Sequence, residues 1–300
     1  MQDMLGFQAA PRAGLDMGSL GSRKDLAEKP ASSEWKKLAK LCPSPGKRAA
    51  YKSAVRKGVP HELRPQLWLA LSGALAKQAS ALPGYYSGLT AAGQLTTGVP
   101  ADVVRQVDTD TRTLPSNFRA HASFLQPETI SAHSRILFGL LRHNTQLVYG
   151  RPLCHIVAFS MVVLGGYSQE ESAFWLVAAL LEDTLFPYCG GKWQWGVRVE
   201  QGVLEQLVAR KLPRLATHLA SLRCDLAAIT GHWLPSLLLA ALPPATCVRV
   251  WDCVMVEGPK VLLRVGLALL KVCVAGDGVQ AVQFPQDPLG SASWPGGSRM

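Results

Sequence analysis

Apolar residues recur at three- and four-residue spacing from about residue 51 to residue 275, and Pro and Gly separate the periodic segments. This spacing is typical of amphipathic α-helices, because it places the apolar side chains on one face. In a predicted helix over residues 60–75, Pro60 stands in the first turn, where proline is tolerated. Its shared face carries Leu63, Leu67, Leu71 and Ala74. The same pattern predicts helices over residues 130–147, 173–183, 201–208, 215–222, 234–242 and 261–273.

No convincing stretch alternates between apolar and polar residues as a half-buried strand does, and no long unit repeats. We therefore predict an all-α fold whose main domain covers residues 51–275. Residues 1–50 are rich in Pro, Gly and Ser, so we expect a largely disordered leader with one short helical patch over residues 33–41. Residues 276–300 are interrupted repeatedly by Pro and Gly, and we expect an irregular tail.

The composition is that of a chain with a sizeable core, since 48% of its residues are hydrophobic and 17% are charged. A bilayer span needs about 20 uninterrupted apolar residues. Residues 153–166 are too few and include His155, and residues 261–276 are interrupted by Arg264 and Lys271. We expect no transmembrane segment and no secretory signal. His155 is interpreted as a core residue rather than a metal ligand.

The cysteines point to a reducing compartment. There are seven, an odd number, and no two form a Cys-x-x-Cys pair. Their neighbours are mostly apolar, so we expect reduced, mostly buried thiols in a cytoplasmic protein, without a disulfide framework. We also predict no metal site and no cofactor. The cysteines are Cys42, Cys154, Cys189, Cys224, Cys247, Cys253 and Cys273.

The formal net charge of +10 is concentrated near the N-terminus, because residues 1–60 hold 12 Lys and Arg against 5 Asp and Glu. We interpret the leader as solvated, and not as a lipid-binding patch of Lys24, Lys36, Lys37, Lys47 and Arg48, although a basic leader attracts anionic lipid or nucleic acid. A nucleic-acid-binding protein is a rival hypothesis that rests on charge alone. The sequence contains no recognised reader motif, and its aromatic residues are not interleaved with the basic ones.

Motifs for self-contained catalysis are absent from the sequence. It contains no Gly-x-x-x-x-Gly-Lys phosphate loop, no His-Glu-x-x-His and no Gly-x-Ser-x-Gly. Several other segments, taken in order, resemble the TBC-domain family of Rab GTPase-activating proteins over roughly residues 52–275. These segments are Val55–Trp68, Pro83-Gly-Tyr-Tyr86, Arg105–Pro115, Glu171-Ser-Ala-Phe-Trp175, Val199–Gln201, Lys211-Leu-Pro-Arg214, Trp233, Arg249-Val-Trp251-Asp252 and Glu257-Gly258.

The resemblance implies two all-helical lobes that dock a GTP-bound Rab and insert two side chains into its nucleotide site. It assigns Arg112, which is followed by Thr-x-Pro, as the arginine finger. The family motif has an Asp three positions before this Arg, whereas Asp110 lies two positions before Arg112. A two-residue step does not place both side chains on one helix face. The alternative to a finger is an exposed Arg112 that only pairs with Asp108 or with Asp110, and both interpretations stay open.

The second family motif carries a glutamine, which this sequence lacks. Tyr149 and Leu153 hold the register, so Arg151 stands at the glutamine position and Pro152 at the following glycine. An arginine has donors but no acceptor and cannot orient a water as an amide does. We expect a weakened GTPase-activating protein, and a catalytically inactive Rab-binding adaptor is the alternative. Peripheral attachment to endomembranes through the Rab also stays open.

The other matched residues are expected to be scaffold. We predict buried aromatic anchors and internal ion pairs involving Arg64 and Asp252. The matches stop near residue 275, which leaves open whether the second lobe is truncated. The predicted anchors are Trp68, Phe174, Trp175, Trp233 and Trp251.

Overall fold

The computed structural model describes residues 35, 37, 38, 43–114, 127–185 and 193–275. Within these residues all regular structure is helical, which confirms the all-α prediction. Short 3₁₀ turns cover Pro45–Lys47, His61–Leu63 and Tyr167–Gln169, and a π turn covers Leu180–Thr184. The α-helices are α2 (Arg48–Lys57), α3 (Arg64–Ser72), α4 (Ala74–Ser80), α5 (Tyr85–Leu89), α6 (Ala101–Arg112), α8 (Pro127–His143), α9 (Arg151–Leu164), α10 (Glu170–Ala179), α11 (Trp193–Lys211), α12 (Pro213–Ser221), α13 (Leu226–Thr230), α14 (Pro244–Glu257) and α15 (Lys260–Ala275).

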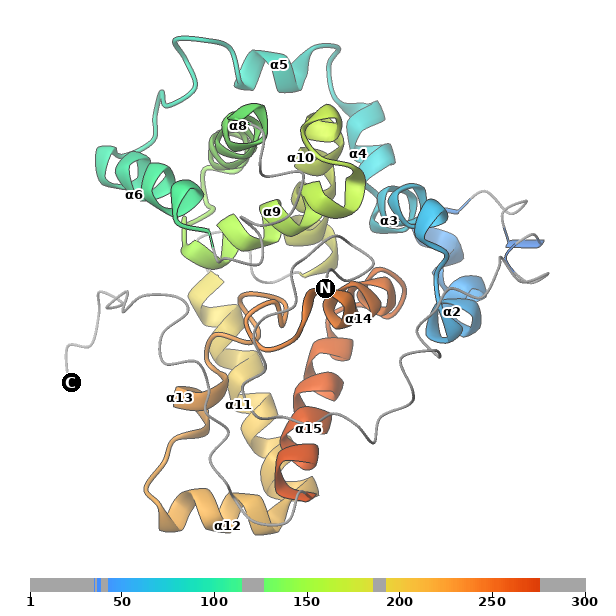
Figure 1. Ribbon diagram of the computed structural model, residues 1–300, viewed down its shortest axis with the longest axis vertical. Helices are drawn as coiled ribbons and strands as arrows, with labels where there is room; N and C mark the ends of the chain where they lie inside the picture. Colours follow the sequence, from blue (N-terminus) through green and yellow to red (C-terminus); the bar gives the residue numbers. More distant parts are fainter. Residues whose placement is uncertain (1–34, 36, 39–42, 115–126, 186–192, 276–300) are drawn as a thin grey trace.

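The helices form two lobes (Figure 1). Helices α3 to α10 make the upper lobe in that view, and α11, α12, α13 and α15 make the lower one. Between the lobes, α14 packs against α2, α3 and α15, so the first and last thirds of the described chain meet there. Helix α9 runs along the lower side of the upper lobe in Figure 1 and packs against α8 and α10.

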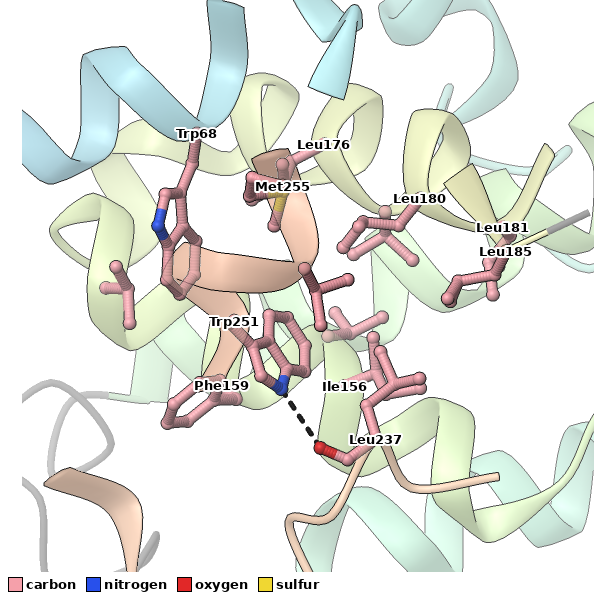
Figure 2. Packing of buried hydrophobic residues seen from close by; sticks show 14 of the residues in the cluster. Trp68, Ile156, Phe159, Leu176, Leu180, Leu181, Leu185, Leu237, Trp251 and Met255 are labelled. Atoms are coloured by element: carbon pink, nitrogen blue, oxygen red, sulfur yellow. Dashed lines mark hydrogen bonds between the residues drawn. The ribbon is translucent and has the colours of Figure 1, made fainter. Parts of the chain in front are cut away.

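Aromatic side chains fill the junction around α14 (Figure 2). The rings of Trp68 and Trp251 stack with centroids 5.6 Å apart, and Phe159 meets Trp251 edge-on at 4.9 Å. The Trp251 indole donates to the Leu237 carbonyl at 3.1 Å, so its one polar atom is satisfied. All five predicted aromatic anchors are at most 2% exposed, which confirms them as core residues.

A buried ion pair connects α3 to α14. Arg64 Nε lies 3.0 Å from Asp252 Oδ1, and a second guanidinium nitrogen donates to the Val59 carbonyl at 2.7 Å. The Trp68 indole donates to the same Asp252 oxygen at 2.7 Å. Burial raises the pKa of Asp252, and Arg64 opposes that shift. The predicted internal pairing of Arg64 and Asp252 is confirmed.

Several predicted helices are present with shifted ends, and two predictions are wrong. The region predicted as one helix over residues 60–75 contains a 3₁₀ turn, α3 and the start of α4, and Gly73, whose φ of 94° is left-handed backbone, separates α3 from α4. Residues 234–242 form successive turns, with Leu237 and Leu238 at φ of 50° and 68°. Their apolar spacing reflects burial, since both leucines are at most 2% exposed. The prediction also did not identify α2, α6, α9 and α14 as helices.

The folded structure begins before residue 51. Trp35 and Leu38 are buried, and the Trp35 indole donates to the Gly58 carbonyl at 2.9 Å. Helix α2 starts at Arg48, so the predicted boundary of the leader is too late. Five of the 12 basic residues in positions 1–60 lie between Lys47 and Lys57, on or beside a folded helix. The rest of the predicted leader and the predicted tail lie almost entirely outside the described residues.

No single helix among the described residues has the length and apolar composition of a bilayer span. The pair Arg151–Leu164 and Tyr167–Thr184 passes that test only together, and it is bent by 102°. Four free cysteines are described, of which Cys154 and Cys247 are buried. His155 is 2% exposed, as expected of a core residue. In the same part of the chain, no group of three or more His, Cys, Asp or Glu side chains is arranged to hold a metal ion.

Candidate functional site

Arg112 is the last residue of α6, and its side chain is 70% exposed. The buried residues Val107 and Leu114 hold the end of this helix against the core. The Arg112 guanidinium pairs with Asp108, one helical turn earlier, through contacts of 2.9 Å from Nε and 2.8 Å from a terminal nitrogen. Of the two pairings left open by the sequence, the one with Asp108 is present.

Asp110 faces the protein interior instead. It is 7% exposed and accepts a hydrogen bond from the Tyr149 hydroxyl at 3.0 Å. Burial raises the pKa of Asp110, while Tyr149 and Arg151 act in the opposite direction. Because Asp110 and Arg112 are two residues apart on a helix, the carboxylate and the guanidinium point in different directions. Asp110 therefore connects α6 to the segment before α9.

Arg151 lies at the point where α9 begins, and it contacts the end of α6. Its Nε is 3.7 Å from Asp110 Oδ1, and a terminal nitrogen donates to the Thr113 carbonyl at 3.1 Å. Thr113 caps the C-terminus of α6, where carbonyl groups lack partners within the helix and cations are favoured. The Arg151 side chain is only 22% exposed. Its guanidinium thus joins the start of α9 to the end of α6.

The titratable side chains beneath these residues are part of the packed core. Burial raises the pKa of the Cys154 thiol well above its usual range, so this thiol stays protonated and unreactive. A ring nitrogen of His133 lies 2.9 Å from the Cys154 carbonyl oxygen, and burial lowers the pKa of His133 to about 4. Burial also lowers the pKa of His155 to about 4. Both histidines are neutral at physiological pH and form part of the packed core.

The structure therefore brings the four predicted site residues together. Tyr149 and Arg151 both contact Asp110 directly, and Arg112 follows Asp110 on the same helix with its charge directed to solvent. Sequence reasoning missed the role of the Thr113 carbonyl, since a backbone acceptor leaves no signal in residue identity.

A family model described as the Rab-GTPase-TBC domain matches residues 61–275. The chain belongs to this family. The resemblance inferred from ordered motifs is thereby confirmed, and the two lobes are those of a TBC domain.

Named relatives are similar over most of this TBC domain. Mouse TBC1 domain family member 2A is 34% identical over 248 residues, which are 82% of this chain and 26% of the mouse protein. Growth hormone-regulated TBC protein 1 of Xenopus laevis is 31% identical over 79% of this chain and 67% of its own length. The chain thus spans about a quarter of the length of the TBC1 family member 2A proteins.

Two solved structures have the same fold. The flagellar RabGAP TBC domain of Chlamydomonas superposes with a TM-score of 0.73 at 30% identity, over 91% of this chain and 88% of that one. The Ypt/Rab-GAP domain of Gyp1p superposes with a TM-score of 0.62 over 82% of this chain and 86% of that one. At 17% identity, the second likeness supports the fold alone.

Proposed function

We propose that this TBC domain is a GTPase-activating protein for a GTP-bound Rab-family GTPase and acts in the cytoplasm. Arg112 is the arginine finger that neutralises charge on the transferring phosphoryl group. The observation that carries the proposal is the position of Arg112. It is a largely exposed guanidinium at the end of α6, at the arginine of the family motif. The nucleotide belongs to the Rab, so the catalytic centre is shared between two proteins.

The reaction needs such a charge. Phosphoryl transfer to water leaves little covalent work for a protein, so catalysis depends on positioning and on stabilising negative charge. An arginine supplied in trans is worth roughly 10³–10⁵ in rate, which corresponds to about 4–7 kcal/mol. The exposed pair with Asp108 is far weaker than this, so it does not prevent Arg112 from entering a nucleotide site.

Arg151 does not replace the missing glutamine. A guanidinium has no acceptor for a hydrogen bond from the attacking water. Its contacts with Asp110 and the Thr113 carbonyl also direct it toward α6. We therefore propose an activator weakened by the absence of a glutamine finger, in which the Rab's own residues position the water.

A second candidate function is a pseudo-GAP, an adaptor that binds a Rab without accelerating hydrolysis. The observation that favours it is the engagement of Arg151 with α6 at the position where the active family members have an amide. The adaptor and the weak activator share the same docking geometry. They differ only in the rate of GTP hydrolysis.

Single-turnover GTP hydrolysis over a panel of Rab proteins tests the proposal. We expect Arg112→Ala to lower the stimulated rate by about 10³-fold or more while leaving the affinity for the Rab nearly unchanged. Arg105→Ala is the matched control, since Arg105 is an exposed arginine about two turns earlier on α6. A wild-type rate in the Arg112 variant would refute the finger assignment. Measurable Rab binding with no stimulation by the wild-type protein would instead establish the adaptor.

Arg151→Gln tests the second part of the proposal. If the missing amide alone limits the rate, we expect this variant to raise it by on the order of tenfold or more. Pro152→Gly combined with Arg151→Gln restores both residue types of the family motif. No gain in either variant would mean that activity is limited elsewhere in the domain.

A further inference from the structure

Positive charge is concentrated on three helices that meet far from the candidate site. Helices α2, α14 and α15 carry eight Lys and Arg against two acidic residues, a net charge of +6 within a chain of +10. One of the two acidic residues, Asp252, is 1% exposed and pairs with Arg64 inside the core. Of the two acidic residues on these helices, Glu257 is therefore the one that lies closer to the surface.

Glu257 forms ion pairs with three basic side chains from two helices. Lys52 and Arg56 of α2 approach its carboxylate at 3.4 and 2.7 Å, and Arg264 of α15 approaches it at 3.1 Å. The three basic side chains are 47 to 58% exposed, whereas the Glu257 side chain is 4% exposed. Hydrogen bonds from Arg56 lower the pKa of Glu257 to about 2, so the carboxylate carries its full charge at neutral pH. One negative charge still leaves this cluster at +2.

Further basic residues extend the cluster on both sides. Arg249 of α14 donates to the Arg56 carbonyl at 3.1 Å, which places it beside α2. On α15, Lys260 lies one turn before Arg264, and Lys271 lies seven residues after it on the same helix face. Both lysines are exposed, and the exposed apolar side chain of Val272 follows Lys271. We call Lys52, Arg56, Arg249, Lys260, Arg264 and Lys271 the basic face.

We propose that the basic face binds the headgroups of anionic lipids at a membrane surface. Each Lys or Arg near an anionic bilayer adds about 1 kcal/mol of attraction, so six of them suffice for reversible peripheral binding even though three of them contact Glu257. A lipid surface can contact side chains spread over three helices at once. Single-stranded nucleic acid would stack its bases on aromatic side chains. Tyr51, the aromatic residue of α2, is 1% exposed, and the exposed apolar residue beside Lys271 is Val272, at 55%.

The basic face and the candidate site lie on different helices. Helix α6 lies at the left of the upper lobe in Figure 1, whereas α2 lies at the right of the molecule. The helix that carries Arg112 and the helix that carries Lys52 and Arg56 are therefore on opposite sides of the molecule in this view. The inference does not depend on the proposed GTPase-activating function, since it concerns a different surface and a different ligand.

Co-sedimentation with vesicles tests the proposal without any Rab present. We expect the whole chain to bind phosphatidylcholine vesicles that contain roughly one third phosphatidylserine, to bind more weakly as salt rises, and to ignore pure phosphatidylcholine. The triple variant Lys52→Gln, Lys260→Gln, Arg264→Gln should lose on the order of hundredfold in vesicle affinity, or about fivefold per side chain. Lys260→Gln alone, outside the Glu257 cluster, should lose about fivefold and gives the same test should the triple variant not fold.

A matched control separates the basic face from net charge. Arg105→Gln, Arg214→Gln, Arg223→Gln removes the same charge from three exposed arginines on α6, on α12 and in the turn after α12. This variant should bind the vesicles within about threefold of the wild type. Equal losses in the two triple variants, or no vesicle binding by the wild type, would overturn the proposal. The proposal would also be overturned if the wild type bound a DNA or RNA duplex more tightly than the vesicles and only the basic-face triple variant lost that binding. The basic face would then be a nucleic-acid site.

Discussion

The pair between Arg112 and Asp108 gives a quantitative test of how the finger is held. The two side chains are 70% and 59% exposed, and their charged atoms approach to 2.8 Å. An exposed pair one helical turn apart stabilises a helix by about 0.3–0.5 kcal/mol, which corresponds to a factor of about two in population. On the proposed function Arg112 must leave Asp108 to reach the nucleotide. Asp108→Asn should therefore raise the stimulated rate of GTP hydrolysis by no more than about twofold.

Single-turnover hydrolysis with the Rab that responds best to the wild-type protein is the assay. Asp102→Asn is the control, because it removes the same charge from the first turn of α6, far from Arg112. High salt should shrink the effect of Asp108→Asn further, since exposed pairs are screened. A change of more than tenfold in either direction would refute the reasoning. Such a change would mean that Asp108 orients Arg112 during the reaction. We expect that role of a buried carboxylate and not of an exposed one.

Three further predictions concern the stability of the scaffold. Asp252→Asn leaves Arg64 buried without its counter-ion and should cost about 3–5 kcal/mol, seen as a lower midpoint in thermal unfolding. Burial lowers the pKa of His133 from 6.5 to about 4, so the unfolded chain takes up this proton first as the pH falls. The free energy of unfolding should therefore decline between about pH 6.5 and pH 4, by up to about 3 kcal/mol for this residue. Urea unfolding measured at several pH values should show a smaller decline for His133→Gln than for the wild type. Gly73→Ala places a side chain on backbone at φ of 94° and should lower the free energy of unfolding by about 1 kcal/mol. Gly46 has no atom within 4 Å of an added Cβ, so Gly46→Ala should lower it less. Equal effects of the two variants in urea unfolding would contradict this reasoning.

The local sequence determined the fold class and several of the helices. Apolar spacing is a local property, and it placed helices where α8, α12 and α15 are found, to within a few residues. The ordered motifs determined the family and selected the residues of the candidate site. Large aromatic residues were assigned to the core correctly, because burying their area is favourable in any packed fold.

Only the tertiary structure decided which partner each polar side chain has. Apolar spacing indicates which residues are buried, but it does not determine their backbone angles. The buried turns at Leu237 and Leu238 were therefore predicted as a helix. The engagement of Arg151 with Asp110, and the convergence of α2 and α15 on Glu257, join residues far apart in the chain. An electrostatic contact depends on distances of a few ångströms. Those distances are set by how the helices pack, and no single stretch of sequence contains them.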